Sequence, residues 1–331
     1  MTLVGRRLAW PAAVLAPALA ALLSLAVGTR PVPPSAVLDA LLHGGSSADA
    51  LVVRSLRLPR TEVGLTAGAA LGVAGAALQA VTRNPLADPG ILGLSQGAAA
   101  GVVLAIALGL ANGFGGYVWY AFAGAVVAAC LVYAIAARGR GGASPVKLAL
   151  AGTALSAMTA GGTTVVLTSS SATLDQFRFW QVGALSGRDA GTVVRMLPFL
   201  VVGAVLVLGC ARGLDALALG DETARGLGHR VQVVRGVAAL GATLMTAAAV
   251  AAAGPIAFVG LAVPHLARRV VGGGYRGVLP LSALLGAALL LAADVAGRVV
   301  RAPAEVPAGV MTALVGVPVL VFLVRRKGAV S

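Results

Sequence analysis

Long stretches without any charged residue divide this chain, and they constrain its fold more than any other feature. The longest of these runs are residues 8–29, 63–82, 89–137, 148–174, 196–211, 236–267, 277–293 and 306–324. The apolar core of a bilayer requires a helix of about 20 mostly apolar residues. Only 11% of the residues are charged, against about 25% in a typical soluble domain. The sequence therefore predicts an all-α, polytopic integral membrane protein.

The lengths of these runs predict ten transmembrane helices. Residues 89–137 can form two helices with a turn near 111–117, and residues 236–267 one full helix and one short helix, broken at Gly254-Pro255. Both chain ends are basic, and loops rich in Lys and Arg remain cytoplasmic. We therefore expect one transmembrane domain, 1–331, with both termini cytoplasmic. The net charge of +14 follows from this topology, and no binding of nucleic acid is expected.

A weak internal similarity indicates a possible inverted repeat. Residues 84–99 (NPLADPGILGLSQGAA) are similar to residues 254–267 (GPIAFVGLAVPHLA), and each stretch follows a long helix and opens a Gly-rich one. The two preceding helices are expected to run in opposite directions, as in the inverted repeats of many transporters. The two halves are expected at about 61–168 and 236–324.

The motif GLSQG at 93–97 has the G-x-S-x-G pattern of a serine hydrolase. A nucleophile elbow requires a strand before the serine, whereas the polar turn TRNPLADPG precedes Ser95. His265 is the histidine that could approach Ser95 inside the membrane. A membrane hydrolase built on Ser95 and His265 is therefore an alternative that this context disfavours.

Glycines at four-residue spacing offer another explanation of the same motif. Such glycines allow membrane helices to approach closely. The helix-packing glycines predicted in this way are Gly64, Gly68, Gly72, Gly93, Gly97 and Gly101.

The stretch QAVTRNPLADPGILG (79–93) interrupts the apolar pattern with two Asx-Pro pairs. A proline disfavours helical backbone in the residue before it. The segment is either a simple inner loop or a gating elbow, since irregular backbone at membrane depth is tolerated beside a cavity. The residues alone leave both interpretations open.

The sequence contains no motif for binding and hydrolysing ATP. Its two lysines, Lys147 and Lys327, do not belong to a phosphate-binding loop. Ionisable residues within the spans are almost absent, which disfavours the second alternative, an ion-coupled carrier. Cys130 and Cys210 are isolated, so neither a disulfide framework nor a metal site is expected. The longest inner segment, 214–235, is either a solvated amphipathic loop or a docking segment for a cytoplasmic partner.

Four ordered blocks of the sequence resemble the FecCD-type permeases, the membrane subunits of ABC importers for ferric siderophores, haem and vitamin B12. The resemblance covers about residues 20–326, and its blocks are RLPR…GAALGVAGAALQAVTRNPLADPGILGLSQGAAAG (57–101), LGDETARGLG (219–228), GPIAFVGLAVPHLARRVVG (254–272) and LLLAADVAGRVVRAPAEVPAGVMTALVGVPVLVFLV (289–324). It implies an iron-siderophore or related permease in the bacterial cytoplasmic membrane, which is not itself an enzyme.

The resemblance also implies partners. These are a second permease subunit, two cytoplasmic ATP-binding cassette subunits that hold ATP and Mg, an extracytoplasmic substrate-binding protein and membrane lipid. No cofactor or metal is expected on this chain.

Site residues carry over from the family by position. Contacts with the ATPase are expected at Leu219, Gly220, Asp221, Glu222, Ala224, Arg225 and Gly228. The arginines expected to receive glutamates of the binding protein are Arg57, Arg60 and Arg298. The gate and pathway residues are Asn84, Pro85, Leu86 and, in a second element, Ser144.

Overall fold

The computed structural model describes residues 3–28, 30–110, 113–138 and 144–328, and these ranges contain helices and no β-strand. The long or apolar helices coincide with the charge-free runs. They are α1 (Leu3–Ala26), α4 (Leu58–Thr82), α5 (Leu94–Ala107), α6 (Gly113–Ala137), α7 (Pro145–Ser169), α9 (Gly191–Gly209), α12 (Val231–Ala253), α13 (Val259–Val271), α14 (Tyr275–Val300) and α15 (Ala308–Gly328).

Shorter elements connect these helices. They are α2 (Pro34–Leu42), α3 (Ala48–Leu51), the π-helical segment η1 (Val52–Arg57), the 3-10 helix η2 (Pro89–Leu92), α8 (Ser171–Gln181), α10 (Ala211–Ala218) and α11 (Asp221–Gly226). The break expected at Gly254-Pro255 is confirmed, because α12 ends at Ala253 and α13 starts at Val259. The turn expected near 111–117 includes residues 111–112, which lie outside the described residues.

Six of the described helices are long and apolar enough to cross a membrane. They are the continuous rod Ala48–Thr82, which joins α3, η1 and α4, together with α6, α7, α9, α12 and α14. The apolar stretches Trp10–Ala26, Leu94–Ala107 and Ala308–Pro318 are shorter. This set of helices supports the expectation of a multi-pass membrane protein.

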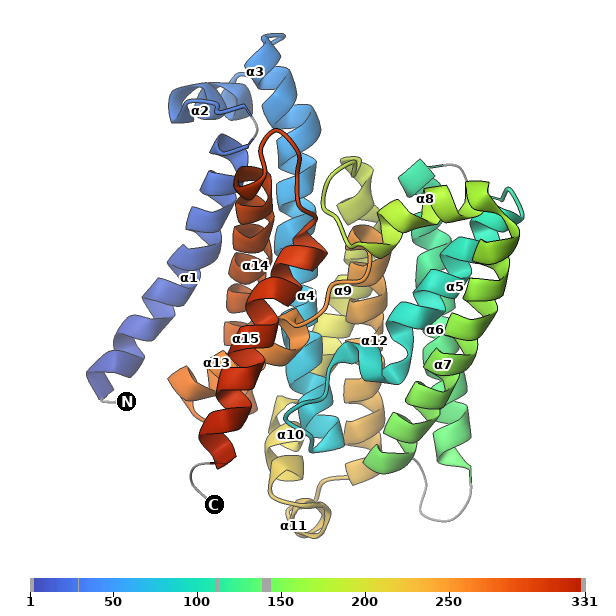
Figure 1. The fold of residues 1–331 in the computed structure, drawn as a ribbon. Helices are drawn as coiled ribbons and strands as arrows, with labels where there is room; N and C mark the ends of the chain where they lie inside the picture. Colours follow the sequence, from blue (N-terminus) through green and yellow to red (C-terminus); the bar gives the residue numbers. More distant parts are fainter. Residues whose placement is uncertain (1–2, 29, 111–112, 139–143, 329–331) are drawn as a thin grey trace.

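The molecule has two distinct ends. Both chain ends lie in the half of the molecule that contains α10 and α11, whereas α2, α3 and α8 lie at the opposite end (Figure 1). We call the end with α10 and α11 the inner end, and the end with α2, α3 and α8 the outer end. The side chains of the basic residues at both termini lie outside the described part of the chain.

Helices α4 and α12 form the centre of the bundle. In their most apolar windows, 83% and 78% of the residues are buried, compared with 17% in α7. Residues of α4 and α12 are mostly Ala, Gly and Val, and small side chains allow several neighbours to pack around one helix. Helix α7 therefore presents most of its apolar surface outward.

The predicted glycines lie where helix backbones cross. A Cβ atom added to Gly68 would lie 2.4 Å from the carbonyl oxygen of Gly286 on α14, and one added to Gly72 would lie 2.2 Å from that of Ser282. On α5, the corresponding distance is 2.2 Å between Gly101 and the carbonyl oxygen of Tyr120 on α6. These three crossings leave no room for a side chain.

The other predicted glycines differ in what they contact. A Cβ atom on Gly97 would lie 2.4 Å from the Cβ of Ala128, and one on Gly64 would lie 2.4 Å from a methyl carbon of Leu291. Gly93 instead has a φ angle of +73° and ends the 3-10 helix η2. Its role is conformational, because a left-handed residue at this point lets α5 start in a new direction.

Candidate transport pathway and docking surfaces

Two breaks in the helical pattern meet at one cavity. The first break is residues 83–93, between α4 and α5, and the second is residues 254–258, between α12 and α13. Both contribute to the lining of a cavity of about 520 Å³, which we call the pathway cavity. Its lining residues are Asp88, Gly90, Ser95, Gln181, Val182, Pro255, Ile256, Ala257, Gly309, Val310 and Ala313.

The two breaks have similar geometry, although they are far apart in the sequence. Each follows a long buried helix, and each ends in a left-handed residue, Gly93 (φ +73°) or Phe258 (φ +69°), from which a short helix starts. The first break also touches α13 directly after the second break, because a Cβ atom on Gly260 would lie 2.8 Å from the ring of Pro89. Irregular backbone at membrane depth is tolerated where it lines a cavity, and both breaks satisfy this condition.

Gln79 on α4 holds the two breaks together. Its side-chain nitrogen donates to the carbonyl oxygens of Ala87 in the first break (3.4 Å) and of Gly260 and Leu261 at the start of α13 (both 3.3 Å). The guanidinium of Arg268 donates to the amide oxygen of Gln79. Sequence reasoning missed Gln79, although a lone amide within the apolar run GAALQAV was a visible signal.

The predicted gate residues lie in the first break, at its inner side. The side-chain oxygen of Asn84 accepts a hydrogen bond from the backbone nitrogen of Leu86 (2.9 Å), which fixes the turn around Pro85. The side chain of Leu86 is 46% exposed. Ser144, the predicted second gate residue, is the N-cap of α7 and accepts from the backbone nitrogen of Lys147 (3.4 Å).

The environment of Ser95 differs from that of a hydrolase nucleophile. Ser95 lies in the first turn of α5, after the 3-10 helix η2, so no strand precedes it. His265 lies on α13, where its Nδ1 atom is 3.2 Å from the carbonyl oxygen of Leu261. Ser95 lines the pathway cavity and His265 does not.

The outer arginines lie together, at the end of η1 (Arg57), on α4 (Arg60) and on α14 (Arg298), and two of them are buried. Arg57 is 6% exposed and Arg298 is 2% exposed. Arg57 donates to the carbonyl oxygens of Leu25 (2.7 Å) and Ala26 (2.8 Å) at the end of α1. Arg298 donates to the carbonyl oxygen of Ser24 (2.8 Å). These guanidiniums therefore cap α1, whose last carbonyl groups have no partner within the helix.

Arg60 lies between two carboxylates. It donates to both carboxylate oxygens of Asp294 (2.8–3.1 Å) and, through Nη1, to Glu305 (2.7 Å). Asp294 is fully buried and also accepts from Arg298. Asp294 is thus an ionisable residue inside the bundle, where two arginines compensate its charge.

The inner segment 214–235 comprises the second half of α10, all of α11 and the start of α12. Ala224 is fully buried and anchors α11, whereas Leu219 is 67% exposed. Gly220 (φ +118°) and Gly228 (φ +82°) flank α11 in conformations that favour glycine. The side chains of Glu222 and Arg225 are exposed at the inner end.

Asp221, the first residue of α11, connects this segment to the first break. It pairs with Arg83, the residue before Asn84, and with Arg235 on α12 (3.1 Å). Arg83 also donates to the carbonyl oxygen of Leu217 on α10 (3.2 Å). One carboxylate therefore joins α11, the start of the gate segment and α12.

Comparison with known proteins identifies the family to which this chain is similar along most of its length. The FecCD transport family matches residues 16–326. The ferric enterobactin transport system permease protein FepD of Escherichia coli (strain K12) is 45% identical over 98% of this chain and 97% of its own. The cobalamin import system permease protein BtuC of Halobacterium salinarum is 41% identical over 84% of this chain and 74% of its own.

A solved structure of a metal-chelate type ABC transporter in an inward-facing conformation has a TM-score of 0.82 to this chain. It is 26% identical, and the alignment covers 97% of this chain and 99% of that one. The fold is that of a multi-pass membrane permease. This chain belongs to the FecCD transport family. It is the permease subunit of an ABC importer and not an enzyme.

Proposed function

We propose that this permease carries a ferric siderophore, or a related chelate such as haem or cobalamin, across the bacterial cytoplasmic membrane. The observation that carries this proposal is the 45% identity to a ferric enterobactin permease along 98% of the chain. Relatives named for Fe(3+)-citrate and iron(3+)-hydroxamate import, at 40% and 41% identity, support the same substrate class.

The proposed topology has ten transmembrane helices and cytoplasmic termini. The position of both chain ends in the half of the molecule with α10 and α11 supports it (Figure 1). The breaks at 83–93 and 254–258 support an inverted repeat of the halves 61–168 and 236–324. The inner end would then dock two ATP-binding cassette subunits, which supply ATP and Mg, and the outer end would dock an extracytoplasmic binding protein.

The proposed path for the chelate runs along the pathway cavity and is completed by a second permease subunit. Helices α7 and α15 support this arrangement, because apolar side chains such as Met158 (68% exposed) and Leu314 (63%) have no cover within one chain. The first break, with Asn84, Pro85 and Leu86, would close the path at its inner end, and Ser144 would contribute from α7.

The proposed route of coupling runs through α11. Leu219 offers an exposed apolar contact to the ATPase, with Gly220, Glu222, Arg225 and Gly228 around it. Movement of α11 would reach the gate through Asp221 and Arg83, because the ion pair joins α11 to the residue that precedes Asn84. Ala224 would transmit force rather than touch the partner, since it is buried.

The proposed docking of the binding protein uses the outer arginines in different ways. Arg60 is the least buried of the three, with a side chain that is 11% exposed, and its present partner Glu305 is 34% exposed and can exchange with a glutamate of the binding protein. Arg57 and Arg298 would support this surface from below, because they fix the end of α1. Bidentate pairing of a guanidinium with a carboxylate is a strong contact of this kind.

The test is uptake of radiolabelled ferric siderophore by vesicles that contain the permease, its ATPase and its binding protein. In the variant Leu219→Glu, we expect ATP-dependent uptake to fall at least tenfold, with the permease folded. Leu219→Met, which keeps an apolar side chain at the same exposed position, is the matched control and should retain uptake. Full uptake in Leu219→Glu would contradict the docking of the ATPase at this segment. A complex that transports no ferric chelate would contradict the substrate class.

A further inference from the structure

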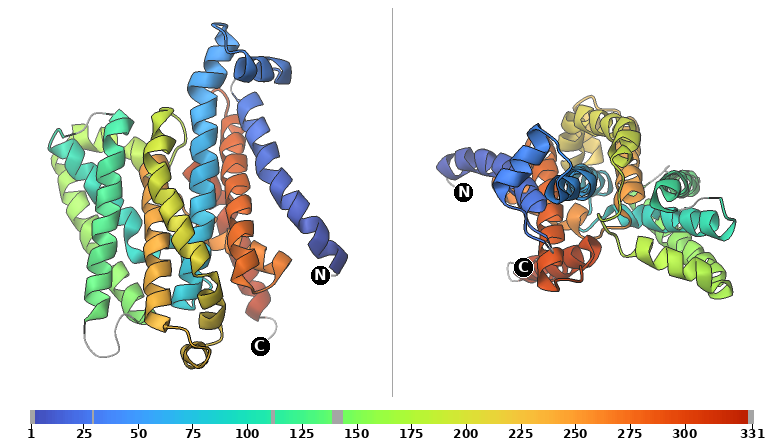
Figure 2. Two further views of the ribbon diagram at one scale, coloured as in Figure 1. Left: turned by 180° about the vertical axis from the view of Figure 1, so that it is seen from behind. Right: turned by 90° about the horizontal axis from the view of Figure 1, so that it is seen from above.

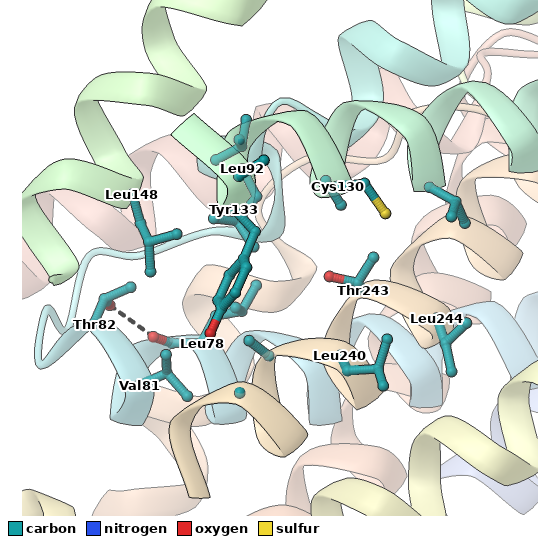
Figure 3. Close-up of a pocket in the computed structure, with 16 residues that line it drawn as sticks. Leu78, Val81, Thr82, Leu92, Cys130, Tyr133, Leu148, Leu240, Thr243 and Leu244 are labelled. Atoms are coloured by element: carbon teal, nitrogen blue, oxygen red, sulfur yellow. Dashed lines mark hydrogen bonds between the residues drawn. The ribbon is translucent and has the colours of Figure 1, made fainter. Parts of the chain in front are cut away.

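A second cavity lies outside the proposed pathway and has a different character. It has a volume of about 420 Å³ and lies between α4, α6 and α12 in the inner half of the bundle. Figure 3 shows its aliphatic side chains, with the hydroxyl groups of Tyr133 and Thr243 and the thiol of Cys130 among them. We call it the lateral cavity. Its lining residues are Leu78, Val81, Thr82, Leu92, Val126, Ala129, Cys130, Val132, Tyr133, Ala134, Leu148, Gly236, Ala239, Leu240, Thr243 and Leu244.

The lateral cavity opens at the side of the bundle. Cys130 is exposed, and Tyr133 and Leu240 are 43% and 53% exposed. The view from behind shows α6 on the face opposite to α15 (Figure 2). This face is not the one at which a second permease subunit completes the proposed path. In a membrane, an apolar opening on such a face meets acyl chains and not water.

Two basic residues stand at the inner edge of this cavity. Arg138 follows the last turn of α6, and Lys147 lies in the first turn of α7, beside the lining residue Leu148. The Lys147 ammonium donates to the carbonyl oxygen of Arg138 (3.3 Å), so the end of the Lys147 side chain lies beside the backbone from which the Arg138 side chain starts. No Asp or Glu occurs between Asp88 and Asp175 in the sequence. The sequence from α6 to α7 therefore contains basic residues at the inner end and no acidic residue.

We propose that the lateral cavity binds one acyl chain of an anionic phospholipid, with the lipid phosphate beside Arg138 and Lys147. Basic pockets between transmembrane helices on the cytoplasmic side bind anionic head groups, and each basic residue near such a surface contributes about 1 kcal/mol. The cavity holds the chain by apolar burial, while the two cations select the charge of the head group. This inference rests on the proposed topology, in which the inner end is cytoplasmic.

The test is native mass spectrometry of the purified permease with equal amounts of phosphatidylglycerol and phosphatidylcholine that have the same acyl chains. For the first bound lipid, we expect phosphatidylglycerol to be preferred by roughly ten- to thirty-fold, from two residues at about 1 kcal/mol each. The variant Arg138→Gln/Lys147→Gln should lose this preference and still bind phosphatidylcholine. The variant Ala239→Phe, which fills the cavity, should lose the first binding event for both lipids.

A matched control removes two exposed arginines at the outer end, in the variant Arg54→Gln/Arg301→Gln, and should leave the preference unchanged. Equal binding of the two lipids by the unmodified permease would overturn the proposal. So would a preference that persists in Arg138→Gln/Lys147→Gln, or one lost equally in the control. Thermal unfolding of each variant in detergent establishes that it is folded. Because the readout is lipid binding, a negative result would not affect the transport proposal.

Discussion

The contact between Gly75 and Gly260 provides a sharp test of how this bundle is packed. A Cβ atom added to Gly75 on α4 would lie 2.0 Å from the carbonyl oxygen of Gly260 and 2.5 Å from its Cα atom, whereas ordinary contact begins at 3.4 Å. The shortfall of about 1.4 Å involves backbone atoms, so rotation of a side chain cannot relieve it. Substitution of Gly75 by Ala therefore has to push α13 away from α4.

The magnitude follows from two opposing effects. Overpacking of a close-packed core costs about 1–3 kcal/mol and occasionally more. Alanine in place of glycine inside a helix contributes roughly 0.5–1 kcal/mol in the opposite direction. For Gly75→Ala the first effect dominates, so we expect a net loss of about 1–2 kcal/mol. For Gly161→Ala on α7 only the second effect operates, because no atom lies within 4 Å of the added Cβ.

The assay is thermal unfolding of the two variants in detergent, followed by the helical circular dichroism signal and by the folded fraction on size exclusion. Gly75→Ala should have a midpoint a few degrees below that of the unmodified chain, and Gly161→Ala should equal or exceed it. If Gly75→Ala is as stable as Gly161→Ala, then α4 and α13 do not cross at this contact and the reasoning is refuted.

Three further outcomes are expected. Arg298→Leu should lower the free energy of unfolding by about 3–5 kcal/mol, since it breaks a buried ion pair; its exposed neighbour Arg301→Leu should change the same midpoint little. Arg83→Gln and Asp221→Asn should each reduce ATP-driven uptake while ATP hydrolysis continues. The double variant should lose no more uptake than either single variant, and additive losses would contradict coupling through this one ion pair. Gln79→Met should lower the free energy of unfolding by about 1–3 kcal/mol, because buried carbonyl groups lose their donor. An unchanged free energy of unfolding would show that Gln79 does not hold the two breaks together.

Some features of the protein could be predicted from residues alone because they depend on local chemistry. Charge-free runs predicted helices at the positions where the structure has them, since a long apolar segment in a membrane must satisfy its backbone internally. The break at Gly254-Pro255 followed from the conformational preferences of the two residues. The blocks at 57–101 and 219–228 indicated the FecCD family because the order and spacing of residues within a short block can be read directly from the sequence.

Burial and partnership were decided only by the tertiary structure. Arg57, Arg60 and Arg298 look alike in the sequence, yet two of them cap α1 and the third lies between Asp294 and Glu305. Ala224 was expected at a docking surface and is buried. These outcomes depend on which helix lies opposite each side chain. The sequence of one helix does not specify which other helices pack against it.

The sequence likewise could not predict that the two breaks lie against the same cavity. Residues 83–93 and 254–258 are more than 160 positions apart in the printed chain, and their similarity is slight. They line one cavity because Gln79 and the Gly75–Gly260 crossing bring α13 against α4. The sequence by itself determined the helices, the breaks and the family. The packing of small residues at helix crossings determined which breaks meet, because only close backbone contact brings distant segments to the same place.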